Sequence, residues 1–183
     1  MKRKSLVLFI MLFILGITAK SQERIENVRN IIIKNKTLYI KGESKPFTGE
    51  IYRNYDNGSL ELLYKFKDGK PHGRAIENFF NGNREREANY VNGEMHGVYI
   101  SKYNDGKIYT KGNYIHGKAE GLYTSYHNNG KTREKGRYKN GIKDGRWVEY
   151  FNNGRIKMEY TYKNGNLQGR VREYDIKGRL VRK

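Results

Sequence analysis

The stretch "GLYTSYHNNGKTREKGRYKNGIKDG", Gly121 to Gly145, decides the fold because its glycines belong to series that run along the chain. Each series repeats every 24 residues, and no insertion breaks the register. The first series comprises Gly49, Gly73, Gly97, Gly121, Gly145 and Gly169. The second comprises Gly58, Gly82, Gly106, Gly130, Gly154 and Gly178. The third comprises Gly69, Gly93, Gly117, Gly141 and Gly165. A strict period of this length indicates a repeat protein.

Most glycines of the second and third series follow asparagine or aspartate, as in Asn129-Gly130 and Asn140-Gly141. This pair favours a tight hairpin turn, in which both central residues take positive φ. Each repeat should therefore hold two short strands and two reversals, with glycines of the first series at bends. The predicted structural turn glycines are Gly58, Gly69, Gly82, Gly93, Gly106, Gly117, Gly130, Gly141, Gly154 and Gly165.

Aromatic residues share the same period. Seventeen residues after each first-series glycine stand Phe66, Tyr90, Tyr114, Tyr138 and Tyr162. Such columns place aromatic rings of successive repeats side by side, where each cross-strand pair stabilises a sheet by about 0.2–1 kcal/mol. The predicted fold is all-β, with tandem 24-residue β-hairpin repeats forming an elongated antiparallel sheet over residues 49–183.

The two segments before this array do not follow its 24-residue repeat. Residues 22–48 break the register, and "NIIIKNKTLYIKG" predicts a capping hairpin with a turn at Asn35-Lys36. Residues 1–21 carry a basic start, a short apolar run and "TAKS", as in a helical secretory signal peptide. The expected location is therefore the periplasm or cell surface. The alternative is an uncleaved N-terminal anchor in the cytoplasmic membrane.

Composition narrows the possible partners. The chain has no cysteine, which excludes disulfides and thiolate metal sites, and its formal net charge is +18. So basic a protein is attracted to anionic lipid, to acidic envelope polymers or to nucleic acid, and export argues against nucleic acid. The alternative is that the charge only keeps an extended sheet soluble.

Units such as "GRWVEYFNNGRIKMEYTYKNGNLQG" and "PFTGEIYRNYDNG" resemble the bacterial variant of the MORN repeat, the form present in YwqK-type antitoxins. The resemblance covers about residues 38 to 180. It implies an array of β-hairpins that acts as an interaction scaffold, with contacts to proteins or acidic phospholipids. The antitoxin members imply a role in neutralising a partner toxin by binding it.

The sequence offers little chemistry. His72 and His96 occupy one repeat position, where later repeats have Glu120, Asp144 and Gln168. Equivalent positions should lie roughly 9–10 Å apart, too far to share a metal ion, so we expect polar turn residues facing water. Nucleophile, zinc-protease and phosphate-loop motifs are absent from the sequence. We therefore expect a protein that is not an enzyme, with no cofactor, no metal and no small-molecule substrate.

Two sets of residues are candidates for binding. The basic row follows second-series glycines and consists of Lys107, Lys131, Arg155 and Arg179. The tyrosine column consists of Tyr90, Tyr114, Tyr138 and Tyr162. For the basic row the alternative is solubility and edge protection, and for the column it is packing. The expected function is an exported scaffold that binds a protein partner or an anionic envelope component through a basic, Tyr-rich β surface. The alternative is an antitoxin-like protein.

Overall fold

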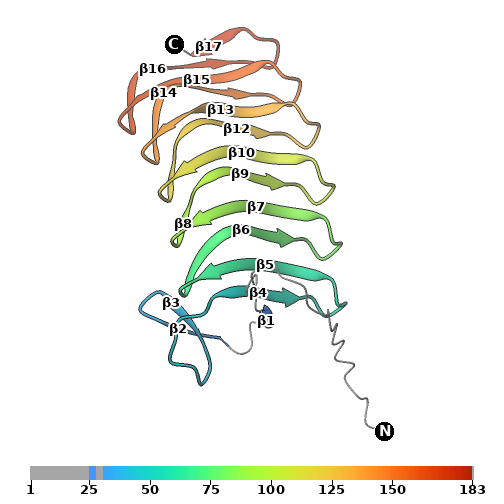
Figure 1. Cartoon of the computed structure of the whole chain (residues 1–183). Coiled ribbons are helices and arrows are strands. Elements are labelled where there is room, and N and C mark those ends of the chain that lie inside the picture. Colours follow the sequence, from blue (N-terminus) through green and yellow to red (C-terminus); the bar gives the residue numbers. More distant parts are fainter. Residues whose placement is uncertain (1–24, 28–30, 183) are drawn as a thin grey trace, which may run out of the picture.

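The computed structural model describes residues 25–27 and 31–182, and these fold into β-strands (Figure 1). The predicted signal peptide, residues 1–21, lies outside the described residues. Among the described residues, no helix is long and apolar enough to cross a membrane. The strands are β1 Ile25–Asn27, β2 Ile31–Lys34, β3 Thr37–Ile40, β4 Gly49–Asn54, β5 Leu60–Lys67, β6 Lys70–Asn78, β7 Arg84–Val91, β8 Glu94–Met95, β9 Gly97–Lys102, β10 Ile108–Ile115, β11 Lys118–Ala119, β12 Gly121–Tyr126, β13 Thr132–Lys139, β14 Ile142–Tyr150, β15 Ile156–Lys163, β16 Asn166–Tyr174 and β17 Leu180–Arg182.

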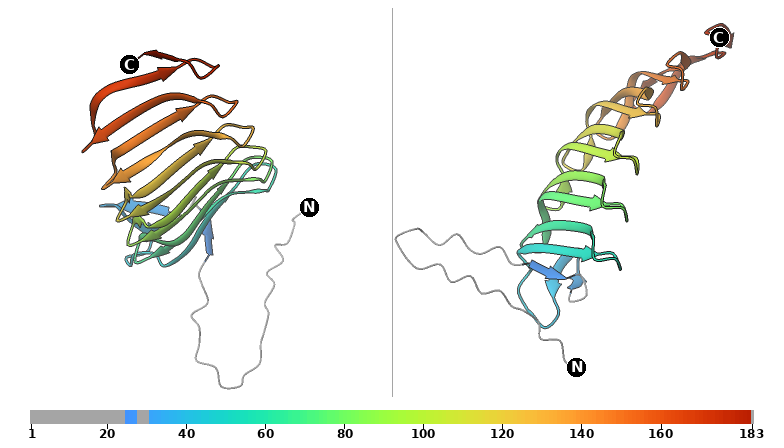
Figure 2. Two further views of the ribbon diagram at one scale, coloured as in Figure 1. Left: turned by 90° about the horizontal axis from the view of Figure 1, so that it is seen from above. Right: turned by 90° about the vertical axis from the view of Figure 1, so that its right-hand side faces the viewer.

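From β4 to β17 the strands pair antiparallel in chain order, as the glycine spacing predicts. Each hairpin meets the next, and the short strands β8 and β11 extend the pairing at one edge. Figure 2 shows that the strands bend strongly, so the sheet forms an open trough. The predicted antiparallel sheet over residues 49–183 is confirmed, and at its N-terminal end β1, which precedes the array, adds to it by running parallel to β4. A strand that enters from before the array has no hairpin to fix its direction.

The third-series turns have the predicted form. Asn140 and Gly141 both take positive φ, 54° and 82°, and Lys139 pairs with Ile142 across the two-residue loop. Successive turns are also joined, because the amide of Gly141 donates to the Ala119 carbonyl at 2.8 Å. Equivalent bonds of 2.8–3.0 Å start from Gly69, Gly93, Gly117 and Gly165. This edge of the sheet is therefore a continuous backbone ladder.

The second-series turns are different from the prediction. Positive φ falls on Gly130 but not on Asn129, and the loop between His127 and Lys131 has three residues. This is a turn followed by a glycine bulge, which needs left-handed backbone only at its last loop residue. The asparagine serves through its side chain instead. Its Oδ1 accepts the Lys131 amide at 3.1 Å, and its Nδ2 donates to the Asn152 carbonyl of the next repeat at 2.7 Å.

First-series glycines do mark bends. Gly73 has φ 88° inside β6, and the β5–β6 ladder shifts register between Tyr64 and Phe66, opposite this point. A side chain would be strained in this conformation, so the bend requires glycine.

The N-terminal hairpin lies where the sequence places it, with β2 and β3 joined by a turn at Asn35-Lys36. It packs on the first repeat through Leu38, Ile40, Phe47 and Ile51, the hydrophobic core at this end of the array. The Leu38 amide donates to the Gly69 carbonyl at 2.8 Å. The hairpin thus covers the first turn of the third series.

Candidate binding face

Rings from successive hairpins line one face of the trough. Residues two apart on a strand share a face, and in the hairpins β9–β10, β12–β13 and β14–β15 both strands contribute rings to it. We call this surface the aromatic face; it comprises Tyr64, Tyr90, Tyr99, Tyr114, Tyr123, Tyr138, Trp147, Tyr160 and Tyr162. The ring centroids of Tyr99 and Tyr114 are 5.7 Å apart and those of Tyr123 and Tyr138 are 5.6 Å apart. Offset and edge-to-face pairs at such distances add to the stability of the sheet.

Trp147 is the most buried ring of the aromatic face, with 0% of its surface exposed. Its Nε1 donates to the Arg137 carbonyl at 3.1 Å. The Nζ of Lys143 lies 3.8 Å from the indole centroid and 2.8 Å from an oxygen of Glu134. By contrast Val98, which points to the other face, is 48% exposed. Burial on the other face is not uniform, because Val148, the neighbour of Trp147 along β14, is only 3% exposed.

Burial changes the acid–base behaviour of the tyrosines. It raises the pKa of Tyr90, Tyr114, Tyr123 and Tyr138 above the ordinary value for tyrosine. Tyr160 also has a raised pKa, through burial and through its hydrogen bond of 2.6 Å to Glu149. These hydroxyls therefore stay protonated and can donate hydrogen bonds at neutral pH.

The tyrosine column of the sequence analysis lies entirely on the aromatic face. Tyr90, Tyr114, Tyr138 and Tyr162 are half-buried. The last three contact a ring on a neighbouring strand, whereas Tyr90 on β7 contacts Tyr64 of β5 across β6. The column therefore contributes to packing, and part of each ring remains accessible.

The basic row lies elsewhere. Lys107, Lys131, Arg155 and Arg179 are exposed at the second-series turns. Lys131 immediately precedes β13 and Tyr138 stands near the other end of that strand, a path of roughly 23 Å along the chain at about 3.3 Å per residue. The structure does not bring the two candidate sets together.

Each cation of the basic row contacts a turn. Lys107 and Arg179 pair with acids of their own turns, Asp105 at 2.9 Å and Asp175 at 2.7 Å. Lys131 and Arg155 instead reach carbonyls of the next turn, at 2.9 Å and 3.2 Å. Lys131 and Arg155 therefore help to hold successive turns together, while the charges of all four residues remain at the surface.

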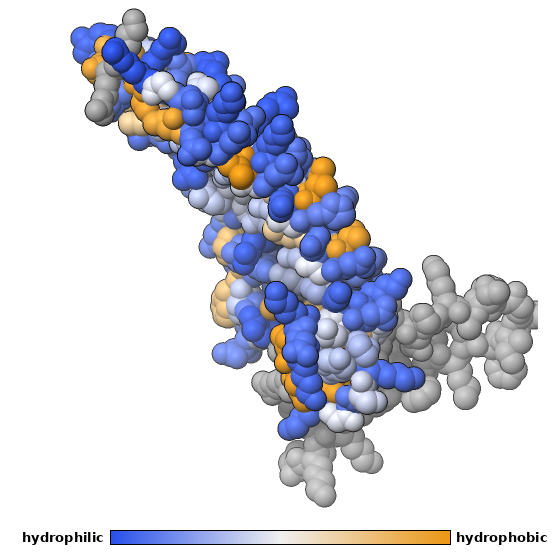
Figure 3. All heavy atoms as spheres, turned by 90° about the vertical axis from the view of Figure 1, so that its left-hand side faces the viewer, coloured by the Kyte–Doolittle hydropathy of each residue, from blue (hydrophilic) through white to orange (hydrophobic). Residues whose placement is uncertain are grey.

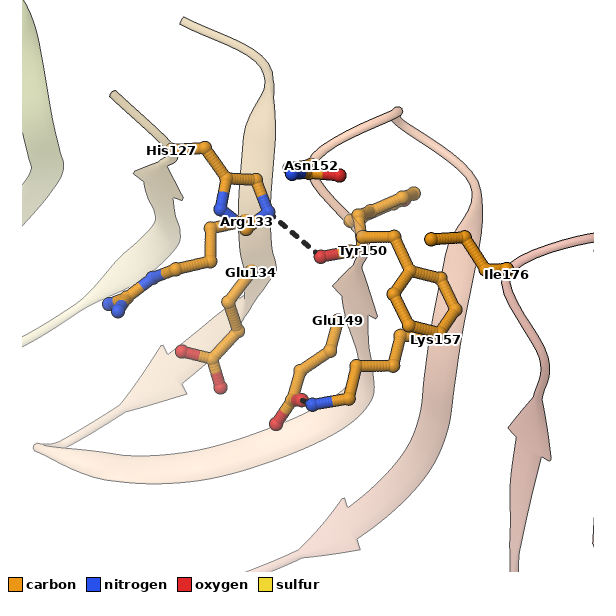
Figure 4. Close-up of a pocket in the computed structure, with 9 residues that line it drawn as sticks. His127, Arg133, Glu134, Glu149, Tyr150, Asn152, Lys157 and Ile176 are labelled. Carbon is orange, nitrogen blue, oxygen red and sulfur yellow. Dashed lines mark hydrogen bonds and ion pairs between the residues drawn. The ribbon is translucent and has the colours of Figure 1, made fainter. Parts of the chain in front are cut away.

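A cavity of about 720 Å³ opens beside the last turns of the array (Figure 4). Glu134 and Glu149 are direct cross-strand partners in it, and their carboxylates lie on the same side of the sheet. Each is engaged, Glu134 with Lys143 and Glu149 with the Tyr160 hydroxyl at 2.6 Å. His127, at the rim, contacts the Tyr150 carbonyl through Nε2 at 2.9 Å. The cavity is thus lined by charges of both signs, and suits polar recognition.

The polar column around the histidines has a structural task that the sequence analysis missed. Each member precedes a first-series glycine, and three of them, His72, Glu120 and Asp144, accept a hydrogen bond from an amide of the next third-series turn. Glu120 accepts from the Asn140 amide at 2.7 Å, and Asp144 from the Asn164 amide at 3.3 Å. In the part of the chain described, no cluster of three or more His, Asp or Glu side chains could hold a metal ion.

The sequence analysis did not predict two features of the structure: the ladder of asparagine side chains at the second-series turns and the paired carboxylates of Glu134 and Glu149. The ladder had a signal, since asparagine recurs with the period at Asn57, Asn81, Asn129 and Asn153. In the sequence analysis these asparagines predict only the backbone conformation of the turns, not side-chain hydrogen bonds between them. The carboxylate pair depends on register across a bulge. Glutamate recurs at the Glu149 position, as Glu77 and Glu173, but not at the Glu134 position, so the period does not predict the pair.

Figure 3 looks onto the edge that carries the third-series turns, and its surface is mainly hydrophilic with separate hydrophobic groups. Exposed apolar side chains flank these turns, with Val91 at 40%, Ile115 at 44% and Ile142 at 47% exposure. They are dispersed among lysines, so the edge offers no continuous apolar surface on the described residues.

Comparison with known families agrees with this geometry. Residues 71–92, 95–116, 119–140 and 143–164 match the model of the MORN repeat variant. The chain carries tandem MORN-variant repeats. Each match begins just after one third-series turn and ends within the next, so one MORN-variant repeat is one hairpin with a second-series turn at its tip. The hairpins β4–β5 and β16–β17 continue this geometry beyond the matches. A search of curated proteins gave no match.

Proposed function

We propose that this protein is an exported, non-enzymatic scaffold that binds a protein partner of the cell envelope through the aromatic face. The observation that carries the proposal is the state of the rings: Tyr90, Tyr114 and Tyr138 are half-buried and pre-ordered on a curved sheet. Rigid tyrosines lose little conformational entropy when they are covered, which suits them to anchor an interface.

Export is part of the proposal and rests on the sequence of residues 1–21. It is tested by fractionating the native host with an epitope tag after Lys183. Processing of the tagged protein and its recovery outside the cytoplasmic membrane would support export. Full-length protein in the cytosol would overturn it.

An anionic lipid or acidic envelope polymer is the competing partner within the same proposal. The basic row favours it, because Lys107, Lys131, Arg155 and Arg179 keep a line of charges at the surface. Binding by such a row weakens steeply with ionic strength, whereas a ring-anchored protein interface weakens little.

One sedimentation experiment separates these partners. Purified protein lacking residues 1–21 is mixed with envelope fragments, with protease-treated fragments, and with vesicles of anionic phospholipid, at about 50 mM and about 500 mM salt. We expect binding to untreated fragments at both salt concentrations and its loss after protease treatment. Binding to vesicles that salt abolishes would assign the partner to the anionic lipid. Failure to bind envelope fragments at either concentration would overturn the scaffold proposal.

An antitoxin-like role is the second candidate, favoured by the resemblance of the repeats to those of YwqK-type antitoxins. The aromatic face would then cover a toxin. Each protein encoded next to this one in the native host is tested as the toxin. Expression of this chain should restore growth to cells that such a protein inhibits, and a variant with Tyr114 and Tyr138 changed to alanine should not. Restoration by neither protein would remove this role.

A further inference from the structure

Two tyrosine pairs of the aromatic face enclose a second cavity. Tyr99 and Tyr114 form one wall, Tyr123 and Tyr138 form another, and the space between them is about 370 Å³. Gly112 lies in it, and a Cβ built there would make an ordinary contact of 3.7 Å with the Tyr123 ring. We call this cavity the Gly112 slot.

The same place one repeat later is filled by the protein itself. Gly136 stands 24 residues after Gly112, and a Cβ built there would fall 2.1 Å from the Trp147 ring. The indole N–H donates to the Arg137 carbonyl at 3.1 Å, and the Lys143 ammonium covers the ring at 3.8 Å. An indole and a lysine therefore occupy the later position.

Both fillers are smaller at the Gly112 slot. Tyr123 replaces Trp147 and Ala119 replaces Lys143, so the slot keeps its glycine but has a smaller, more distant ring in place of the indole and no ammonium above it. The acceptor is also kept. Asn113, the counterpart of Arg137, lines the slot; its carbonyl accepts the Glu120 amide at 2.8 Å and has a second lone pair.

We propose that the Gly112 slot receives an indole, the side chain of a tryptophan presented by the protein partner, with its N–H donated to the Asn113 carbonyl. This inference rests on the proposed function of the aromatic face as a protein-binding surface. A cationic side chain suits the slot less. Glu134, which neutralises Lys143 at 2.8 Å, corresponds to Thr110 at the slot. The acid that lines the slot, Glu120, already accepts the Asn140 amide at 2.7 Å, and the protein carries a net charge of +18.

The test uses N-acetyl-tryptophanamide as the probe and saturation-transfer NMR as the readout, with purified protein lacking residues 1–21. Transfer should be strong to the indole protons. N-acetyl-phenylalaninamide and the 1-methylindole form of the probe should bind about three- to tenfold more weakly, since neither can donate to the carbonyl. Equal binding of all three probes would contradict the proposed contact with Asn113.

The variant that plugs the slot copies the next repeat. Tyr123→Trp with Ala119→Lys should reduce probe binding at least about tenfold by occupying the slot. Ala119→Met is a second, milder plug, because Met95 stands at the equivalent position one repeat earlier. Val98→Lys is the matched control, as it adds the same charge at an exposed residue of the other face. Melting curves show whether each variant is folded, and unchanged binding in a folded plugged variant would overturn the proposal.

Failure of this inference differs from failure of the proposed function. If the probe does not bind but the protein still sediments with untreated envelope fragments, and the plugged variant does so equally, only the slot inference is wrong. If sedimentation is absent in the unchanged protein, the scaffold proposal itself fails. Loss of sedimentation in the plugged variant alone would support both.

Discussion

The indole of Trp147 lies directly against Gly136, so close that a Cβ at residue 136 would fall 2.1 Å from the ring. The glycine has an extended backbone rather than a left-handed one, and it is required for space alone. Trp147 is also the only tryptophan of the chain. Its fluorescence therefore reports on this single contact.

Gly136→Ala should displace the indole and lower the free energy of unfolding by about 1–3 kcal/mol, the usual effect of overpacking. The emission of Trp147 should shift to longer wavelength as the ring meets water. Gly112→Ala is the matched control, because its Cβ would find only an ordinary contact at 3.7 Å. A Gly136→Ala protein with unchanged melting and emission would contradict the packing described above.

Asn129→Ala tests the ladder of asparagine side chains. It removes the bond to the Lys131 amide at 3.1 Å and the bond to the Asn152 carbonyl at 2.7 Å. We expect a loss of about 1–2 kcal/mol, since each exposed hydrogen bond contributes about 0.5–1.5 kcal/mol. Hydrogen exchange should accelerate at the amide of residue 131. Asn128→Ala, in the same turn, should leave exchange there unchanged.

Stability should fall in alkali, because burial raises the pKa of several tyrosines, including Tyr114, Tyr123 and Tyr138. In the unfolded chain tyrosine loses its proton near pH 10, where the folded protein still holds it. The free energy of unfolding is therefore at its full value below about pH 10 and decreases as pH rises further. Melting temperatures measured from pH 8 to pH 11.5 check this, roughly spanning the tyrosine range.

The control for this pH dependence is Tyr114→Phe, which removes one titrating hydroxyl and keeps the ring. Its melting temperature should decline less steeply above about pH 10 than that of the unchanged protein. The same slope in both proteins would mean that Tyr114 does not contribute. Absorbance at 295 nm reports tyrosine ionisation directly.

Lys36→Gly should stabilise the N-terminal hairpin. Lys36 has φ 61° in a two-residue turn, a conformation that costs a non-glycine residue about 1–2 kcal/mol. Hydrogen exchange at the Leu38 amide, which donates to the Gly69 carbonyl at 2.8 Å, should slow. Lys36→Ala removes the charge but keeps the strain, so exchange should not slow in that variant. Equal slowing in both would assign the effect to charge.

Much of the fold could be predicted because backbone geometry restricts glycine-rich turns more strongly than any other element. Asn140-Gly141 predicts a two-residue turn correctly, since both residues need positive φ. Asn129-Gly130 looks the same in sequence but forms a three-residue loop. The dipeptide alone does not say which residue bears the positive φ. The loop length depends on which flanking residues pair, here His127 with Lys131.

The candidate site was less accessible to sequence reasoning. The position of the tyrosine column on one face follows from alternation along a strand, but the curvature that buries Trp147 does not. The distance between the basic row and the tyrosine column could not be predicted either. The 24-residue period fixes the spacing of both sets across the strands. It does not fix how far apart they lie along a strand, and nearly the whole of β13 separates Lys131 from Tyr138.

The bonds between neighbouring hairpins have one further consequence. The Gly141 amide reaches back to Ala119 and the Asn129 side chain reaches forward to Asn152, and equivalent contacts recur at other junctions. Duplicating or deleting a whole 24-residue unit would recreate the same junction, so length can change during evolution without redesign of the scaffold. What such a change could not recreate is the order of unlike units, in which an open slot at Gly112 precedes a filled one at Gly136. The repeats therefore share one interchangeable backbone, and what distinguishes this protein is the order in which repeats with different side chains follow one another.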